Sequence, residues 1–172
     1  MDSKQVTETI AMIREENLDI RTITMGISLL DCIRGDFDTT AQAVYDKIVA
    51  QAKDLVPVAD QIEEEFGLPI VNKRVSVTPV ALLAGGDTSY DFVKIAQAMD
   101  QAAKDLGIDL IGGYSALVQN GMTPADRALI ASIPDALHQT ERVCSSVNIG
   151  STKSGMNMDA VKLMGEIVQQ VA

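Results

Sequence analysis

The feature that most constrains the fold of this chain is a short apolar run, rich in β-branched residues, that recurs and is followed each time by a longer helical pattern. Such runs predict strands, because β-branched side chains pack well on a pleated surface. The predicted strands span residues 20–31, 73–80, 108–117 and 142–150. The last two begin roughly 34 residues after their predecessors, as expected for parallel strands joined by crossover helices. The sequence therefore predicts an α/β fold.

The helical patterns lie between these strands, and two prolines bear on their continuity. The predicted helices span residues 3–17, 39–66, 89–106, 123–140 and 158–171. Pro57 predicts a kink or a division of the second helix, and Pro134 predicts that the fourth consists of two short pieces, because proline cannot donate the helical hydrogen bond. The first strand is too apolar for a strand with one exposed face, so we expect it to be buried.

Length and charge limit the classes of function. With 172 residues and 47% hydrophobic content, residues 1–172 are expected to form a single domain. The formal charge of -10 and the absence of Trp argue against nucleic acid and against an anionic membrane as partners. The opening residues show no signal peptide, no later segment has the length of a membrane span, and Cys32 and Cys144 form no CxxC pair. A cytoplasmic protein is expected.

Three segments carry a resemblance to a known family: NKRVSVTPVALLAG, DLIGGYSALVQNGMTPADRALIASIPDAL and ERVCSSVNIGSTKSGMNMDAVKLMGE. They resemble uncharacterised protein family 0210 (domain of unknown function 711). The resemblance implies a fold similar to the ten-stranded α/β barrel of pyruvate formate-lyase. Because members are usually more than twice as long, it also implies that residues 1–172 are the N-terminal portion of a larger barrel, incomplete in this chain. It implies no particular reaction, and no glycyl-radical motif is present.

The best candidate for ligand binding is the loop GSTKSGMN after the fourth strand. Ligands of parallel α/β folds collect at the carboxyl ends of the strands. Small residues let a ligand approach the backbone, hydroxyls donate hydrogen bonds, and a lysine beside a helix N-terminus attracts an anion. The candidate ligand-binding residues are Asn148, Gly150, Ser151, Thr152, Lys153 and Ser154. The alternative is a tight polar turn that only caps the last helix.

Two further strand ends offer polar groups. Asp87 and Thr88 in the loop AGGDTS are candidates for ligand binding, where the acid could bind a metal or a substrate amine, and the alternative is that they cap the next helix. Ser115 near the end of the third strand is a candidate that faces the barrel interior. No cluster of His, Cys, Asp and Glu has metal-ligand spacing, so we predict no metal site, and the sequence leaves the cofactor unknown.

Cys144 is a weak candidate for a catalytic nucleophile, because a cysteine in a barrel strand can point into the lumen. The competing interpretation is an inert, buried cysteine. Cys32 follows the first strand and is expected to be the better exposed of the two. His138 precedes the fourth strand, at the end away from the usual site, so a surface or capping role is expected.

The sequence is compatible with three functional hypotheses. The leading hypothesis is part of an enzyme, or an enzyme-like binder, of a small anionic metabolite. The second is a non-catalytic regulatory or sensor protein. The third is a fragment that needs a complementing chain or forms a homo-oligomer, because four parallel strands leave two unpaired edges.

Overall fold

The computed structural model describes residues 2–15, 19–84 and 91–172. The helices are α1 (Ser3–Arg14), α2 (Phe37–Ala52), α3 (Leu55–Phe66), α4 (Phe92–Leu106), α5 (Pro124–His138) and α6 (Met158–Val171). The strands are β1 (Ile23–Ile27), β2 (Lys73–Val77), β3 (Leu110–Leu117), β4 (Val143–Asn148), β5 (Gly150–Ser151) and β6 (Gly155–Met156), and short 3-10 turns η1 (Leu30–Cys32) and η2 (Val80–Ala84) follow β1 and β2.

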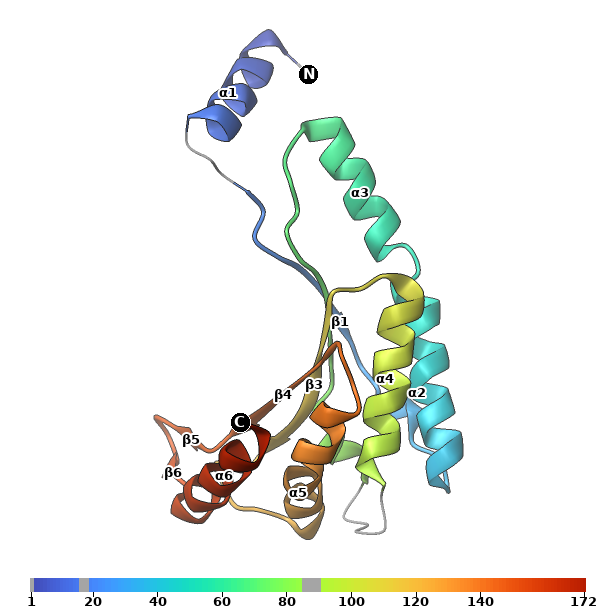
Figure 1. The fold of residues 1–172 in the computed structure, drawn as a ribbon, viewed down its shortest axis with the longest axis vertical. Helices are drawn as coiled ribbons and strands as arrows, with labels where there is room; N and C mark the ends of the chain where they lie inside the picture. Colours follow the sequence, from blue (N-terminus) through green and yellow to red (C-terminus); the bar gives the residue numbers. More distant parts are fainter. Residues whose placement is uncertain (1, 16–18, 85–90) are drawn as a thin grey trace.

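Within the described ranges, β1 to β4 form a parallel sheet whose spatial order is the chain order. The predicted parallel α/β architecture is confirmed. Crossovers between parallel strands are almost always right-handed, so successive crossovers in one direction put every helix on the same face. Figure 1 shows α2, α4 and α5 along one side of the sheet. The pyruvate-formate-lyase-like barrel and the single-domain assignment stay predictions.

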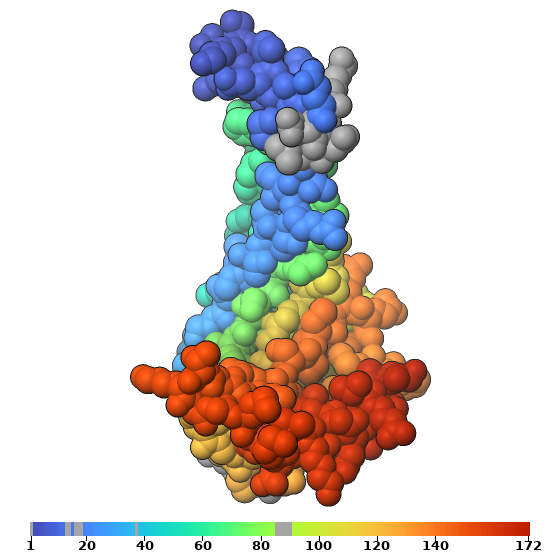
Figure 2. Space-filling view, turned by 90° about the vertical axis from the view of Figure 1, so that its left-hand side faces the viewer, coloured from blue at the N-terminus to red at the C-terminus, as the bar shows by residue number. Residues whose placement is uncertain are grey.

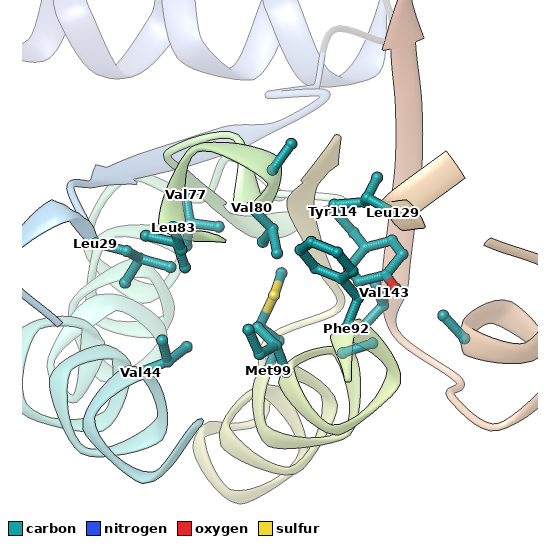
Figure 3. Packing of buried hydrophobic residues seen from close by; sticks show 14 of the residues in the cluster. Leu29, Val44, Val77, Val80, Leu83, Phe92, Met99, Tyr114, Leu129 and Val143 are labelled. Carbon is teal, nitrogen blue, oxygen red and sulfur yellow. The ribbon is translucent and has the colours of Figure 1, made fainter. Parts of the chain in front are cut away.

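The hydrophobic core fills the space between the sheet and these helices. Val77, Tyr114 and Val143 point from the strands toward Phe92 and Met99 of α4 (Figure 3). Leu29 and Val44 extend the same cluster toward η1 and α2, and Leu129 extends it toward α5. Phe92, Ile95, Ala96 and Met99 are all buried, and their spacing is that of one face of a helix.

The two prolines behave differently. The predicted division near Pro57 is confirmed: α2 ends at Ala52 and α3 begins at Leu55. Pro57 is the third residue of α3, where the helix needs no N–H donor. The predicted break at Pro134 is wrong, because α5 continues through it to His138. Ile133 and Ala136, on either side of this proline, are buried in the core, and their packing holds the two turns together.

The sheet has one irregularity, at Gly113 of β3. The register between β3 and β4 shifts between Gly112 and Tyr114, and Gly113 has a φ of 119°. A Cβ atom at this position would lie 2.4 Å from Cγ2 and 2.6 Å from the carbonyl oxygen of Val77. Only glycine fits such a bulge without strain.

The face of the sheet opposite the helices is not covered by any described element. Figure 2 looks onto this side, where the strands lie next to one another. The expectation that the first strand is buried on both faces is therefore wrong: Thr24 and Gly26 are exposed, and only Ile27 of β1 is fully buried. The strand is shorter than predicted, and the apolar residues that follow it belong to η1 and its approach.

Candidate functional site

The uncovered face of the sheet carries small and polar residues together with Leu110 and Leu117, and the strand register aligns them in rows. Side chains alternate between the two faces of a strand, and residues paired in register share a face. Val75 and Val77 are buried under the helices, so Arg74 and Ser76 point to the uncovered face. One row across the sheet is Gly26, Ser76, Gly112 and Cys144. A second row pairs Ser115 with Ser146, and a third pairs Leu117 with Asn148.

Arg74 places a positive charge on this face. It lies in register with Thr24 on β1 and Leu110 on β3. Its Nε atom is buried and has no hydrogen-bond partner. Within the described part of the chain, the guanidinium forms no hydrogen bond or ion pair. An unpaired, partly desolvated guanidinium is costly, so an acceptor that approaches this face would be stabilised by it.

The two glycines beside Arg74 leave space on the face. A Cβ atom built on Gly26 or Gly112 would meet no described atom within 4 Å. Neither glycine has the positive φ that requires this residue type, unlike Gly113. In the part of the chain described, no packing contact requires a glycine at either position. The missing side chains keep the middle of the sheet accessible next to Arg74.

Three residues predicted from the sequence lie together on this face. Asn148 and Cys144 are exposed on the edge strand β4. Ser115 is on the neighbouring strand but is only 7% exposed, and its hydroxyl donates to the carbonyl oxygen of Gly113 at 3.2 Å. Asn148 and Cys144 thus have accessible side chains, whereas the Ser115 hydroxyl is engaged within its own strand.

The predicted ligand loop GSTKSGMN is the β5-β6 hairpin, in which Gly150 pairs with Met156. Its hydroxyl groups bond within the turn: Ser151 Oγ lies 2.6 Å from Ser154 Oγ and accepts from the Ser154 backbone N–H at 3.0 Å. Thr152 and Lys153 are exposed at the tip. The hairpin projects beside β4, at the carboxyl edge of the sheet (Figure 1). Its ligand role stays a prediction, and Asp87 and Thr88 lie outside the described residues.

The predicted relative exposure of the two cysteines is wrong. Cys144 is exposed, whereas Cys32 is only 2% exposed. The η1 turn folds Cys32 back against α2, where its thiol donates to the carbonyl oxygen of Ala43 at 3.5 Å. Burial, followed by the nearby Asp31 carboxylate, raises the pKa of the Cys32 thiol. Cys144 is accessible because its face of the edge strand is uncovered.

Two further expectations concern histidine and metals. His138 is the exposed last residue of α5, which agrees with the expected surface position. Among the described residues, no three His, Cys, Asp or Glu side chains form a group that would hold a metal ion. None of the helices in the described ranges is both long and apolar enough to cross a membrane.

The sequence pattern did not identify Arg74 and Ser76 as candidate site residues. The strand segment KRVSV contained the signal, because its two valines alternate with an arginine and a serine. Alternation alone placed both residues on one face, but it did not indicate that this face lacks a covering layer. The lack of a partner for Arg74 depends on residues distant in the sequence.

The fold and this face define a parallel α/β protein with helices on one side of its sheet and a polar surface on the other. The model of the family described as "Uncharacterised ACR (DUF711)" matches residues 11–172. The chain belongs to this family, which confirms the resemblance. It is 70% identical to a UPF0210 protein of Lacticaseibacillus paracasei and 61% identical to one of Ligilactobacillus salivarius, in both cases over 100% of the chain. It spans 38% of the length of each of these relatives.

Proposed function

We propose that this chain forms one side of a ligand-binding α/β barrel and that the uncovered sheet face binds a small anionic metabolite. The observation that carries the proposal is the unpaired guanidinium of Arg74. Arginine binds carboxylate and phosphate through two parallel hydrogen bonds, and these are stronger where water is partly excluded. Ser76, on the same strand and face, adds a hydroxyl next to the guanidinium.

The space over Gly26 and Gly112 supports the same proposal. Both glycines lie one row from Arg74 toward the carboxyl ends of the strands, in register with Ser76. A ligand lying over this row would contact backbone on either side while its anionic group reaches the guanidinium. The exposed Cys144 completes the row. It is our candidate nucleophile if the protein is an enzyme, and a sensor would bind the same anion without turnover.

The larger barrel is supported by the two edges of the sheet. Beside β1, an apolar pocket of about 300 Å³ includes Met25, Leu55 and Ile62. Beside β4, another pocket of about 300 Å³ includes Leu137, Met164 and Val168. Apolar surface at both edges suits further strand-helix units on either side, and the relatives are long enough to provide them. We infer that this chain acts with such units, in a longer polypeptide, a complementing chain or a homo-oligomer.

The anion site is tested on the 172-residue chain with inorganic phosphate and succinate as separate probes. Backbone amide NMR would follow Ser76 and Gly112 during each titration. At least one probe is expected to shift both signals in a saturable way, and the preferred probe distinguishes phosphate from carboxylate chemistry. The proposal is wrong if neither probe shifts them.

A pair of charge-matched variants separates the Arg74 site from general electrostatics. Arg74→Gln should weaken binding of the preferred probe by about tenfold or more, the usual worth of a hydrogen bond to a charged group. Lys53→Gln removes one positive charge from an exposed position between α2 and α3, in the helix layer, and should leave the affinity unchanged. Equal losses in the two variants would show that the anion responds to net charge, and would exclude this site.

A further inference from the structure

A further pocket, of about 340 Å³, lies at the carboxyl edge of the sheet. It is formed where the end of β3, the first turns of α5 and the start of α6 meet. Its lining residues are Gln119, Gly121, Met122, Arg127, Asn157 and Asp159. The volume lies at the lower end of the range of ligand pockets, roughly 300 to 1,000 Å³. It suits a small metabolite.

Asn157 holds the wall of this pocket in place. Its Nδ2 donates to the carbonyl oxygen of Val118 at 2.8 Å, and its backbone N–H donates to that of Ile149 at 2.8 Å. Its Oδ1 accepts from the backbone N–H of Ala160 at 3.2 Å, which caps α6. The start of α6 is therefore fixed against the end of β3, and the pocket is preformed by backbone and capping contacts.

Two opposite charges face this pocket without pairing. Arg127 and Asp159 are both exposed and both line it. Neither forms an ion pair or side-chain hydrogen bond with the other or with any other residue in the described ranges. The ionised residues that line this pocket therefore carry one positive and one negative charge.

Gln119 adds an acceptor that lacks a donor. Its Oε1 atom is buried and has no hydrogen-bond partner. Buried amide oxygens almost always accept a hydrogen bond, and leaving one without a donor costs about 1 to 3 kcal/mol. Asp159 alone is explained by its place in the first turn of α6, where an acid is favoured. That role does not explain why the Gln119 oxygen lacks a donor or why Arg127 has no partner.

We propose that this pocket binds a free α-amino acid. Arg127 receives the carboxylate, and Asp159 accepts hydrogen bonds from the ammonium group. The Gln119 side chain, whose Oε1 atom is buried without a donor, turns toward the ligand to accept a further hydrogen bond. Met122, which is half-buried, provides an apolar wall for an amino-acid side chain. A zwitterion satisfies both charges and the buried acceptor at once, which an anion or a cation alone does not. The proposal does not depend on the anion site at Arg74.

The test titrates the 172-residue chain with each of the twenty proteinogenic L-amino acids in turn, with acetate and methylammonium as probes of single charge. The amide signals of Gln119, Gly121 and Asp159 are followed by NMR. At least one amino acid is expected to shift these signals and to bind about tenfold or more tightly than either single-charge probe. No response to any amino acid, or an equal affinity for acetate, would overturn the proposal.

Variants on the same helices make the assignment specific. Arg127→Gln and Asp159→Asn should each weaken binding of the preferred amino acid by about tenfold or more, because each removes the partner of one charge. Glu166→Gln on α6 changes an exposed acid outside the pocket and should leave the affinity unchanged. An unchanged affinity in both pocket variants, with a native NMR spectrum, would place the amino acid elsewhere.

Discussion

The Asp100 carboxylate on α4 accepts a hydrogen bond of 2.7 Å from the backbone N–H of Arg142, immediately before β4. The same Oδ1 atom accepts from the backbone N–H of Glu141 at 2.9 Å, and Lys104 pairs with the other carboxylate oxygen at 2.9 Å. Asp100 is only 5% exposed. One buried carboxylate therefore joins the second crossover helix to the start of the last strand of the sheet.

Removing this carboxylate should destabilise the fold. Asp100→Ala leaves the buried N–H groups of Glu141 and Arg142 without acceptors, and we expect a loss of about 2 to 4 kcal/mol in the free energy of unfolding. Asp100→Asn retains one acceptor oxygen and should lose less. Urea denaturation measures both, with the exposed Asp135→Asn of α5 as the control. A loss in Asp100→Ala no larger than in this control would contradict the structural role.

The Asp100 carboxylate should also make stability depend on pH. Burial opposes its ionisation, but hydrogen bonds from Lys104 and from the backbone of Arg142 and Glu141 outweigh this effect and lower its pKa below the ordinary 3.8. Because the folded-state pKa is the lower one, the stabilisation is complete above the unfolded value and is lost as the pH falls through the folded value. In urea denaturation from pH 6 to pH 2, wild type should lose more stability than Asp100→Asn. Parallel curves would argue against this contribution.

Tyr114 and Ser132 form a directional pair inside the core. Ser132 donates its single hydroxyl proton to the Leu129 carbonyl oxygen at 2.7 Å, so the Tyr114 hydroxyl is the donor in the 2.6 Å contact between the two side chains. Burial raises the pKa of Tyr114. Tyr114→Phe should cost about 0.5 to 1.5 kcal/mol, and Ser132→Ala should cost more, about 1 to 3 kcal/mol, because it leaves the tyrosine donor buried without an acceptor. Thermal or urea unfolding tests the order, and the reverse order would refute this assignment of donor and acceptor.

Gly112 and Gly113 should differ sharply although they are adjacent. An alanine at 113 would meet the Val77 carbonyl and adopt a positive φ, so Gly113→Ala should cost about 3 kcal/mol or more. Gly112→Ala meets no described atom within 4 Å and should change stability by less than about 0.5 kcal/mol. Urea unfolding curves of both variants measure the two losses in the free energy of unfolding. Equal losses would show that the bulge does not require a glycine at position 113.

The two cysteines should differ in reactivity toward a thiol reagent. Cys144 is exposed, whereas Cys32 is buried and its pKa is raised by burial. With 5,5′-dithiobis(2-nitrobenzoic acid), native protein should release one equivalent of thiolate quickly and the second only after urea is added. Cys144→Ser should remove the fast phase and Cys32→Ser the slow one. Fast labelling of Cys32 in the native protein would contradict its position under α2.

Sequence by itself determined the order and type of the elements in this chain. The alternation of strand and helix patterns predicted the parallel sheet, because hydrophobic period and turn residues are local properties. The helix predicted from residue 123 agrees with α5, which begins at Pro124 after a capping box formed by Thr123 and Asp126. Pro134 does not divide α5 as predicted, because core packing of residues on both sides outweighs one missing hydrogen bond.

Only the tertiary structure decided which groups are accessible, unpaired or brought together. The exposure of Cys144 and the burial of Cys32 depend on which face of each strand is covered by helices. In the sequence Arg74 is one of several charged residues. It becomes a candidate site because Gly26 on β1 and Gly112 on β3, one row away from it, leave space on the uncovered face. Gln119, Arg127 and Asp159 come from three separate elements. Burial and the absence of a partner are set by contacts between residues distant in the chain, so no local pattern encodes them.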